Sequence, residues 1–405
     1  MAFLSVEEAL RVIEETPRPN RIERVSVFDC CGRIAAGDVV SAVDQPPFDR
    51  SPLDGFAFRS EDVAGASAGR PARLRQTGYV PAGCGETFSV GPGECVRIMT
   101  GGRIPADCDA VVGIEDAGYE EGCGRDGDTA VLIYKAVGHH QNYVFAGEDF
   151  AKGAVLCRAG ERIDAAMAAC LSAAGIPELP VRAKPLVFVL STGSEVCRPN
   201  EVLTEGKIHD SNAVYLSSRL RELGFSCKTD WASDDEALLK RTILENREQF
   251  PLILTTGGVS VGDLDLMPKV LADLGAQILF HGVSLKPGSP LLLARLGACH
   301  ILCLSGNPYA AAATFELFAR PLLAALAADP SLKMAETEGV LAEPFRKGSP
   351  VPRYLRASVK DGLLQVPQGH SSGQLLTMSG CNCLAELPAG DGPFAAGTKL
   401  KVYLL

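Results

Sequence analysis

A loop near the centre of the chain has residue types that suit phosphate binding. From residue 250 to 265 the sequence reads FPLILTTGGVSVGDLD, an apolar run followed by glycines, hydroxyls and carboxylates. Glycines let backbone N–H groups approach an anion closely, and the hydroxyls add further donors. The carboxylates of Asp263 and Asp265 are oxygen ligands of the kind that Mg²⁺ prefers. The loop therefore suits a phosphate that arrives with its metal, and the alternative is a glycine-rich turn of an α/β protein. Its predicted substrate-binding residues are Gly257, Gly258, Ser260, Gly262 and Asp263.

The segments around this loop predict an open, mostly parallel α/β sheet. Apolar runs with the length of buried strands alternate with helix-period stretches, which is typical of a sheet covered by helices on both faces. The predicted strands are 186–190, 251–254, 276–280 and 301–304, and the predicted helices are 209–223, 234–249, 266–274 and 309–327.

Three polar loops follow strands of this predicted sheet, at 191–195, 255–265 and 305–308. Ligands of open α/β sheets bind beyond the carboxyl ends of the strands. We therefore expect the three loops to converge on one site, and their convergence is a stronger signal than any single loop.

The remaining sequence predicts β-rich domains. Short β-branched runs separated by Gly, Pro and Asp precede the α/β region, and strand-like runs with glycine-rich turns follow it. Ser5 and Glu8 have capping-box spacing, so the N-terminus reads as a helix. The predicted domains are an N-terminal helix at 1–20, a mixed connecting domain at 21–44 and 140–180, a β-rich domain at 45–139, the α/β domain at 181–327 and a small C-terminal β-barrel at 328–405.

Composition excludes several classes of protein. The 405 residues are 46% hydrophobic and 22% charged, which excludes a disordered chain and indicates several domains. The net charge is −10 and no Lys/Arg run occurs, so nucleic acid is not an expected partner. The acidic N-terminus is unlike a signal peptide, and no run of about 18 uninterrupted apolar residues occurs, so we expect a cytoplasmic protein without a membrane partner.

The fourteen cysteines do not indicate a zinc site or a disulfide framework. No C-x-x-C occurs, and His139 and His140 are adjacent, whereas neighbours in sequence seldom bind one metal together. We expect most of the cysteines to be small buried hydrophobic residues.

Eight segments in order resemble the molybdopterin molybdenumtransferase family, of the MoeA and gephyrin E-domain type. They cover nearly the whole chain, so chance agreement is not credible. The segments are PPFDRSPLDGFA, RIMTGGRIPADCDAVVGIED, GEDFAKGAVLCRAGERI, STGSEV, GKIHDSN, TTGGVSVGDLD, VSLKPGSP and LSGNP.

The resemblance implies a metal-assisted transferase. Adenylylated molybdopterin and molybdate or tungstate would enter, Mg²⁺ or another divalent cation such as Zn²⁺ would assist, and molybdenum cofactor and AMP would leave. It also implies a homodimer, with other cofactor-biosynthesis proteins or apo-molybdoenzymes as candidate partners. An acidic protein holds such polyanions with a bridging metal, backbone amides and a few placed cations.

The resemblance also supplies most of the predicted site. The predicted catalytic residues are Asp54, Asp149, Glu195, Asp234, Asp265 and Lys286, with Glu195 and Asp265 as metal ligands. The further predicted substrate-binding residues are Thr100, Ser191, Thr192, Gly193, Ser194, Asp210, Asn212, Gly306, Asn307, Pro308, Arg353, Arg356 and Ser372.

Structural explanations exist for four of these acids. Asp54 precedes a glycine as turn aspartates do, and Asp149 is a loop aspartate. Asp210 and Asp234 stand where helix N-caps are expected.

The chain departs from the family pattern near the expected oxyanion site. Ser289 replaces a lysine, Ser305 replaces a proline, and an arginine before the GED segment is missing. The loss of two cations is expected to weaken or retune oxyanion binding, which leaves molybdate and tungstate as alternatives.

Two other hypotheses remain open. The chain could be a non-catalytic molybdopterin-binding scaffold, or another α/β enzyme such as the adenylyl-transferring relative or a nicotinamide-nucleotide amidase. The retained acids and Lys286 argue against a scaffold, and the PPFDRSPLDGFA segment has no purpose in those other enzymes.

Overall fold

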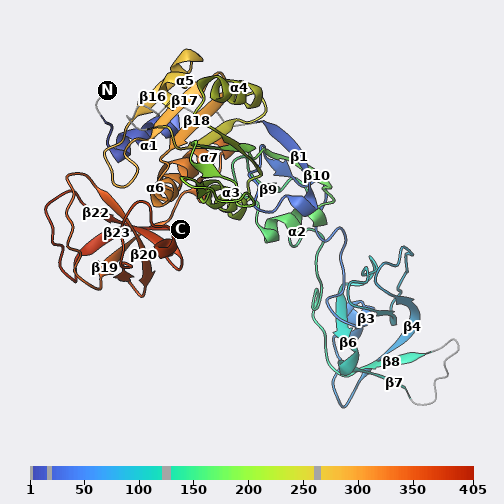
Figure 1. Ribbon diagram of the computed structural model, residues 1–405. Coiled ribbons are helices and arrows are strands. Elements are labelled where there is room, and N and C mark those ends of the chain that lie inside the picture. Colours follow the sequence, from blue (N-terminus) through green and yellow to red (C-terminus); the bar gives the residue numbers. More distant parts are fainter. Residues whose placement is uncertain (1–2, 16–20, 121–128, 260–265) are drawn as a thin grey trace. The chain divides into compact units, whose positions relative to one another are not determined.

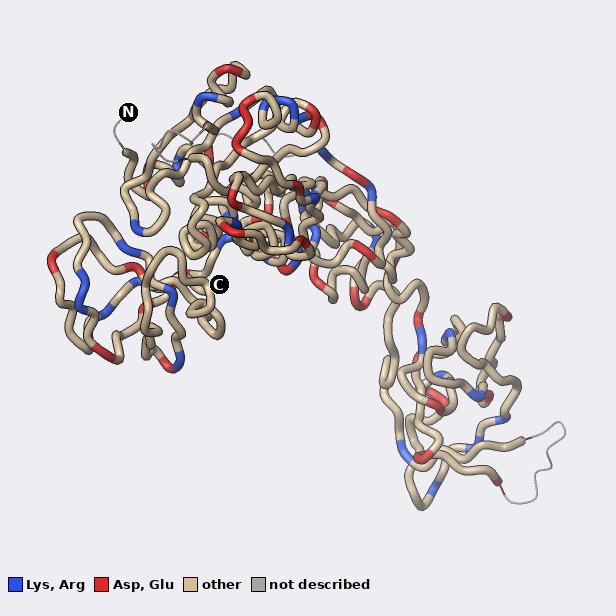
Figure 2. The backbone as a smooth tube through the Cα atoms, viewed as in Figure 1, with Lys and Arg blue, Asp and Glu red and all other residues tan. Residues whose placement is uncertain are grey.

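The computed structural model describes residues 3–15, 21–120, 129–259 and 266–405. The chain forms two compact units (Figure 1). Unit 1 comprises Met1–Glu23 and Val181–Leu405, and unit 2 comprises Arg24–Pro180. Basic and acidic residues are interspersed along the described backbone of each unit (Figure 2). The boundaries of the five domains proposed from sequence stay predictions.

Unit 1 contains a six-stranded sheet that confirms the predicted α/β architecture. Four strands run parallel, and β17 runs antiparallel to both of its neighbours. The sheet order is β14 (Cys227–Ala232), β11 (Val187–Thr192), β15 (Leu252–Thr256), β18 (Cys299–Leu304), β17 (Leu292–Leu296) and β16 (Gln277–His281). Sequence analysis did not predict β17, which follows the turn-rich segment KPGSP.

Alternating strand residues build a separate core on each face of this sheet. Val187 and Val189 join one apolar cluster, while Phe188 and Leu190 join the other. Successive strand side chains point to opposite faces, so an uninterrupted apolar run can serve both cores. One cluster includes residues of α1 (Val6–Glu15), α3 (Asn212–Glu222), α6 (Pro308–Thr314) and α7 (Arg320–Ala327), and the other includes residues of α4 (Glu236–Asn246) and α5 (Met267–Asp273).

The helical segment Pro308–Ala327 has the length and apolar composition of a membrane span, but 83% of its apolar window is buried inside the protein. Such burial is the property of a core helix, and both of its α-helical parts contribute to the first cluster. The predicted single helix 309–327 is interrupted by η4 (Phe315–Ala319), a π-helical turn.

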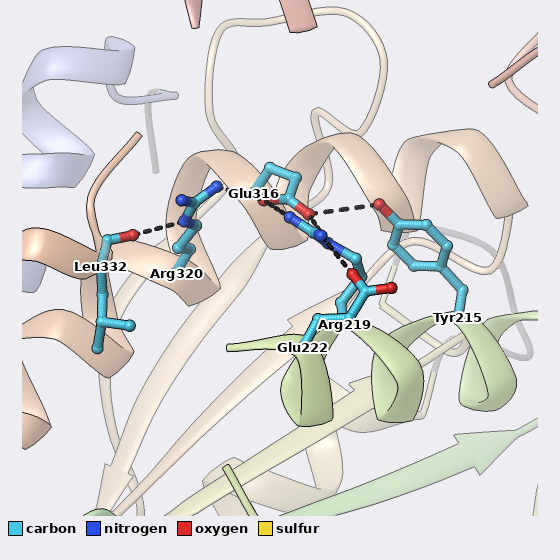
Figure 3. Close-up of polar contacts among 6 residues, drawn as sticks. All are labelled: Tyr215, Arg219, Glu222, Glu316, Arg320 and Leu332. Atoms are coloured by element: carbon cyan, nitrogen blue, oxygen red, sulfur yellow. Dashed lines mark hydrogen bonds and ion pairs between the residues drawn. The ribbon is translucent and has the colours of Figure 1, made fainter. Parts of the chain in front are cut away.

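Glu316, in this turn, forms a buried ionic cluster (Figure 3). Its carboxylate is fully buried and accepts from Arg219 Nε at 2.7 Å and from Arg320 Nη1 at 3.2 Å. Tyr215 Oη donates to it at 3.4 Å, and Arg320 Nε donates to the Leu332 carbonyl. Burial opposes the charge of Arg219, but its hydrogen bonds and attraction to Glu316 outweigh burial and raise the pKa of Arg219. The cluster therefore ties α3 to the helix formed by α6 and α7.

The C-terminal part of unit 1 is a closed β-barrel, as predicted. Leu355, Leu364 and Val402 are among the residues of its apolar core. Its strand order is β19 (Glu336–Leu341), β21 (Leu363–Gln365), β20 (Arg353–Lys360), β22 (Cys383–Leu387) and β23 (Lys399–Leu404).

Unit 2 is built around another six-stranded sheet, which agrees with the β-rich pattern of its sequence. Phe56, Leu74 and Val131 belong to the apolar core on that sheet. The order is β6 (Ala110–Gly113), β3 (Gly55–Phe58), β5 (Glu94–Ile98), β4 (Ala72–Val80), β8 (Ala130–Ile133) and β7 (Ala117–Tyr119). Further elements are α2 (Ala165–Ala173), the pair β2 (Val39–Val40) and β9 (Val155–Cys157), and the pair β1 (Ile22–Ser26) and β10 (Glu178–Arg182).

The thirteen cysteines among the described residues are all free, and eight of them are buried. Burial raises the pKa of the Cys303 thiol to about 12, and that of Cys95 likewise. These thiols are protonated and inert, as expected for small hydrophobic residues.

The buried cluster predicts a large effect of Glu316→Gln on stability. This change keeps the side-chain shape but leaves two arginines near a neutral group, and breaking a buried pair costs about 3–5 kcal/mol. The matched control is Glu222→Gln, because Glu222 contacts the same Arg219 from an exposed position. The control should cost at most about 1 kcal/mol.

Urea unfolding followed by the fluorescence of Trp231, the single tryptophan of the chain, measures both variants. Equal small losses for the two variants would show that the Glu316 cluster does not stabilise unit 1.

Candidate active site

A cavity of about 780 Å³ lies at the carboxyl ends of β15 and β18. It is lined by the loops after these strands, by the turn around Lys286, by the start of β20 and by the segment 370–372. Glu195, Gly257 and Ser305 represent all three polar loops in its wall. The expected convergence of the loops is therefore present. The lining also includes Gly258, Lys286, Gly306, Asn307, Pro308, Arg353, Arg356 and Ser372 from the predicted site.

Hydroxyls at the end of β11 tie this strand to β15, and the loop after β11 begins at residue 193, not at 191 as the sequence predicted. Ser191 and Thr192 are buried, and both bond to Thr256 on the adjacent strand, at 3.3 Å and 3.0 Å. Gly257 has a φ of +94°, and a Cβ there would lie 2.5 Å from the Thr192 carbonyl oxygen. The two loops therefore approach each other so closely that only glycine fits. Ser191 and Thr192 also line a small neighbouring cavity of about 50 Å³.

Asp234 and Ser194 hold each other. The Ser194 N–H donates to Asp234 Oδ2 at 2.7 Å, and the Asp234 N–H donates to Ser194 Oγ at 3.2 Å. Asp235, not Asp234, caps α4 by accepting from the Leu238 N–H at 2.7 Å. Asp234 thus positions the loop after β11 at Ser194, the residue that precedes Glu195.

Asp210 has a structural role that leaves its carboxylate fully engaged. It accepts from the N–H groups of Asn212 and Ala213 at 2.8 Å and 3.1 Å, and from Trp231 Nε1 at 2.7 Å. These bonds start α3 at Asn212, whereas sequence analysis placed the helix start at residue 209; His209 belongs to the short strand β13 (Ile208–His209), paired with β12 (Val196–Cys197).

Asn212 lies between α3 and the loop after β18. Its Nδ2 donates to the Gly306 carbonyl at 2.8 Å, while its Oδ1 is buried and accepts from no donor of the described residues. A buried amide oxygen normally has a donor, so this atom is available to a donor from a ligand.

Two arginines on β20 supply positive charge to the cavity without a described carboxylate partner. Arg356 is 1% exposed, lies 3.8 Å from the centre of the Tyr309 ring, and donates to the carbonyls of Ser371 at 2.9 Å and Gly369 at 3.3 Å. Burial lowers the pKa of Arg356, but guanidinium groups stay charged in proteins. The Nε atoms of Arg353 and Arg356 are both buried and have no acceptor within the described parts of the chain. These donors fit the oxygens of an anion.

Lys286 and Ser372 also line the cavity, and Lys286 adds a third cation to its wall. The backbone of Lys286 is paired to the barrel, because its N–H donates to Pro352 O at 2.9 Å and its carbonyl accepts from the Tyr354 N–H at 2.8 Å. Its side chain is exposed and therefore free to reach a ligand. The Ser372 carbonyl accepts from the Tyr309 N–H at 2.8 Å, at the start of α6.

Three predicted site residues lie in unit 2. Thr100 donates to Asp54 Oδ1 from its N–H at 2.8 Å and from its hydroxyl at 2.7 Å. These two bonds lower the pKa of Asp54, which stays ionised at neutral pH. Asp149 is exposed, and its N–H donates to the Gln45 carbonyl at 2.9 Å. The structure thus brings Asp54 and Thr100 together. Ser260, Gly262, Asp263 and Asp265 lie outside the described residues.

Sequence reasoning missed Tyr309 and His370, which both line the cavity. Tyr309 directly follows the Asn-Pro of the LSGNP segment, which was a usable signal. His370 lies two residues before Ser372 in a segment without periodic pattern, so no local signal indicates it. Ser289, where the family has lysine, bonds its hydroxyl to the Leu285 carbonyl at 3.0 Å.

Three family regions match along the chain. Residues 4–175 match the MoeA N-terminal region (domain I and II), and residues 188–325 match a probable molybdopterin binding domain. Residues 338–405 match the MoeA C-terminal region (domain IV).

Whole-chain relatives agree with these matches. A molybdopterin molybdenumtransferase of Bacillus subtilis is 33% identical over 99% of this chain and 94% of its own length. One from Staphylococcus aureus (strain MSSA476) is 33% identical over 99% of this chain and 95% of its own length. The crystal structure of a molybdopterin biosynthesis MoeA protein from Pyrococcus horikoshii has 31% identity and a TM-score of 0.85, covering 100% of this chain and 99% of that one. The chain belongs to the molybdopterin molybdenumtransferase family.

Proposed function

We propose that this protein inserts molybdate or tungstate into adenylylated molybdopterin, with release of AMP. As a member of its family, the chain is an enzyme of molybdenum cofactor biosynthesis. The non-catalytic scaffold hypothesis is not favoured, because the relatives at 33% identity are named as transferases. The proposal includes the cytoplasm as the place of action.

The observation that carries the proposal is the pair of orphan arginine donors. Arg353 and Arg356 both line one cavity, and each has a buried Nε–H without an acceptor among the described residues. An oxyanion supplies several acceptor oxygens, and hydrogen bonds from ionised donors are about twice as strong as neutral ones. We assign these two groups, with Lys286 and Ser372, to hold and orient the oxyanion.

The loop after β15, which also lines the cavity, suits the pterin nucleotide. Gly257 and Gly258 bring backbone close to the ligand, and Asn212 Oδ1 in the neighbouring small cavity can accept from a pterin N–H. Cleavage of a phosphoanhydride depends mainly on charge stabilisation and on positioning of the attacking oxygen. Holding oxyanion and nucleotide in one cavity supplies that positioning.

A divalent cation fits the oxygen donors of this site. The described residues contain no group of three or more His, Cys, Asp or Glu side chains that could hold a metal. Mg²⁺ commonly uses one or two carboxylates together with substrate phosphates, so an all-protein cage is not needed. Glu195 lines the cavity and would be one ligand, with Asp265 as the expected second. When bound, the cation would neutralise phosphate charge.

The proposal also includes a homodimer. Asp54 and Thr100 belong to unit 2, whereas Lys286 and the arginines belong to unit 1. We infer that unit 2 of a second subunit completes the active site, with Asp54 and Asp149 facing the substrate.

Arg353→Gln tests the oxyanion assignment. Losing a charge-assisted hydrogen bond costs about 1.5–3 kcal/mol, so the KM for molybdate should rise by about 10- to 100-fold. Lys360→Gln is the matched control, because Lys360 is an exposed cation on the same strand and does not line the cavity. Initial rates of AMP release from adenylylated molybdopterin measure both, and an equal KM for both variants would contradict the assignment.

Asp265→Asn tests the metal assignment. The variant should lose AMP release almost completely, because metal neutralisation of phosphate supplies several kcal/mol to the transition state. A folded variant that releases AMP at a near-normal rate would remove Asp265 from the metal site.

Mixed dimers test the shared site. Asp54→Ala and Lys286→Ala subunits, each inactive as homodimers, should recover about a quarter to a half of the wild-type activity when co-assembled, because one of the two sites is then intact. Two differently tagged subunits, purified through both tags, provide the heterodimer. Formation of the heterodimer without recovered activity would place both residues in one subunit's site.

A further inference from the structure

His370 is a titratable residue in the cavity wall that the preceding account leaves without a role. It lines the same cavity as Arg353, Arg356 and Ser372. Its ring packs edge-on against Phe345 at 5.0 Å, and neither ring nitrogen forms a hydrogen bond to the described residues. Both nitrogens are therefore available to a ligand.

Cations dominate the surroundings of His370. Burial lowers its pKa below the ordinary value, and the charges of Arg356, Lys347 and Arg353 lower it further. Lys286 and Glu195 line the same cavity as His370. A second cavity, which His370 also lines, has Glu343, Arg346 and Cys381 in its wall. Cations thus outnumber carboxylates around the ring, and the imidazole is neutral in the free protein at pH 7.

We propose that His370 is a proton-dependent oxyanion-binding residue, neutral in the free protein and protonated when the oxyanion is bound. This inference rests on the proposed function of the cavity. On binding, the imidazole takes one proton from solvent, and the imidazolium N–H donates to an oxygen of the anion.

The change of His370 from neutral to protonated follows from the negative charge of the ligand. A dianion offsets the cations that oppose protonation, and an opposite charge within about 4–6 Å raises the pKa of a histidine. Binding then takes up a proton, so affinity for the anion must rise as pH falls between the two pKa values. Each unit of difference between free and bound pKa is about a tenfold change in affinity.

The protonated His370 would compensate for the lysine that is absent at position 289. The serine that replaces the family lysine directs its hydroxyl to the Leu285 carbonyl and supplies no charge to the cavity. His370 supplies a cation only when the anion is present. The cavity therefore contains one fewer permanent cation, and its affinity for the oxyanion depends on pH.

Calorimetric titration of the full-length protein with molybdate tests the inference. At about pH 6.5, near the ordinary pKa of histidine, the wild type should bind roughly tenfold more tightly than at about pH 8.5, which is well above it. Near the midpoint, the binding heat should depend on the ionisation enthalpy of the buffer, with uptake of close to one proton. His370→Gln should remove the proton uptake and most of the pH dependence.

His370→Lys provides a second variant. A permanent ammonium should keep affinity high at both pH values without proton uptake, which a merely structural histidine would not produce. Binding by the wild type without pH dependence, or unchanged pH dependence in His370→Gln, overturns the inference alone. Absence of molybdate binding at either pH overturns the proposed function and the inference with it.

Discussion

The buried carboxylate of Glu316 holds together the two helices on which the site depends. Its partner Arg219 lies on α3, whose first residue, Asn212, contacts the loop after β18. Its other partner, Arg320, lies on α7, in the same helical segment, Pro308–Ala327, as Tyr309. Buried charges are costly unless paired, so this cluster disfavours arrangements that separate the two helices. The start of each helix then meets the carboxyl edge of the sheet at a fixed place.

A positive cavity inside an acidic protein is the second constraint. The chain has a net charge of −10, yet its largest fully buried side chain is Arg356. Backbone carbonyls and the face of Tyr309 hold this guanidinium, so its charge is stabilised locally without being neutralised. A carboxylate partner would satisfy the donors and close the site to anions. The open donors of Arg353 and Arg356 are the basis of the proposed binding of an oxyanion in this cavity.

Sequence patterns predicted the parts of the fold that repeat. Buried strands such as 251–254 and turn-separated β runs were recognisable, and the α/β sheet and the C-terminal barrel are confirmed. Ten of the twenty-two residues that line the cavity belong to the predicted site, although their roles stay predictions. Three-dimensional contacts decided the rest. Glu316 looks like a surface residue in sequence, because its partner Arg219 lies 97 residues away. Asp234 and Asp235 are equivalent candidates for a helix cap until the bond from Ser194 separates them.

Locating the oxyanion itself tests the central claim most directly. Crystals soaked in tungstate, with data collected at the tungsten absorption edge, would place the metal independently of any activity. The account predicts an anomalous peak in the cavity between β20 and the Lys286 turn, with tungstate oxygens about 3 Å from the Nε atoms of Arg353 and Arg356. A peak only at another basic surface, such as the cavity beside Arg247 and Arg295, would contradict it.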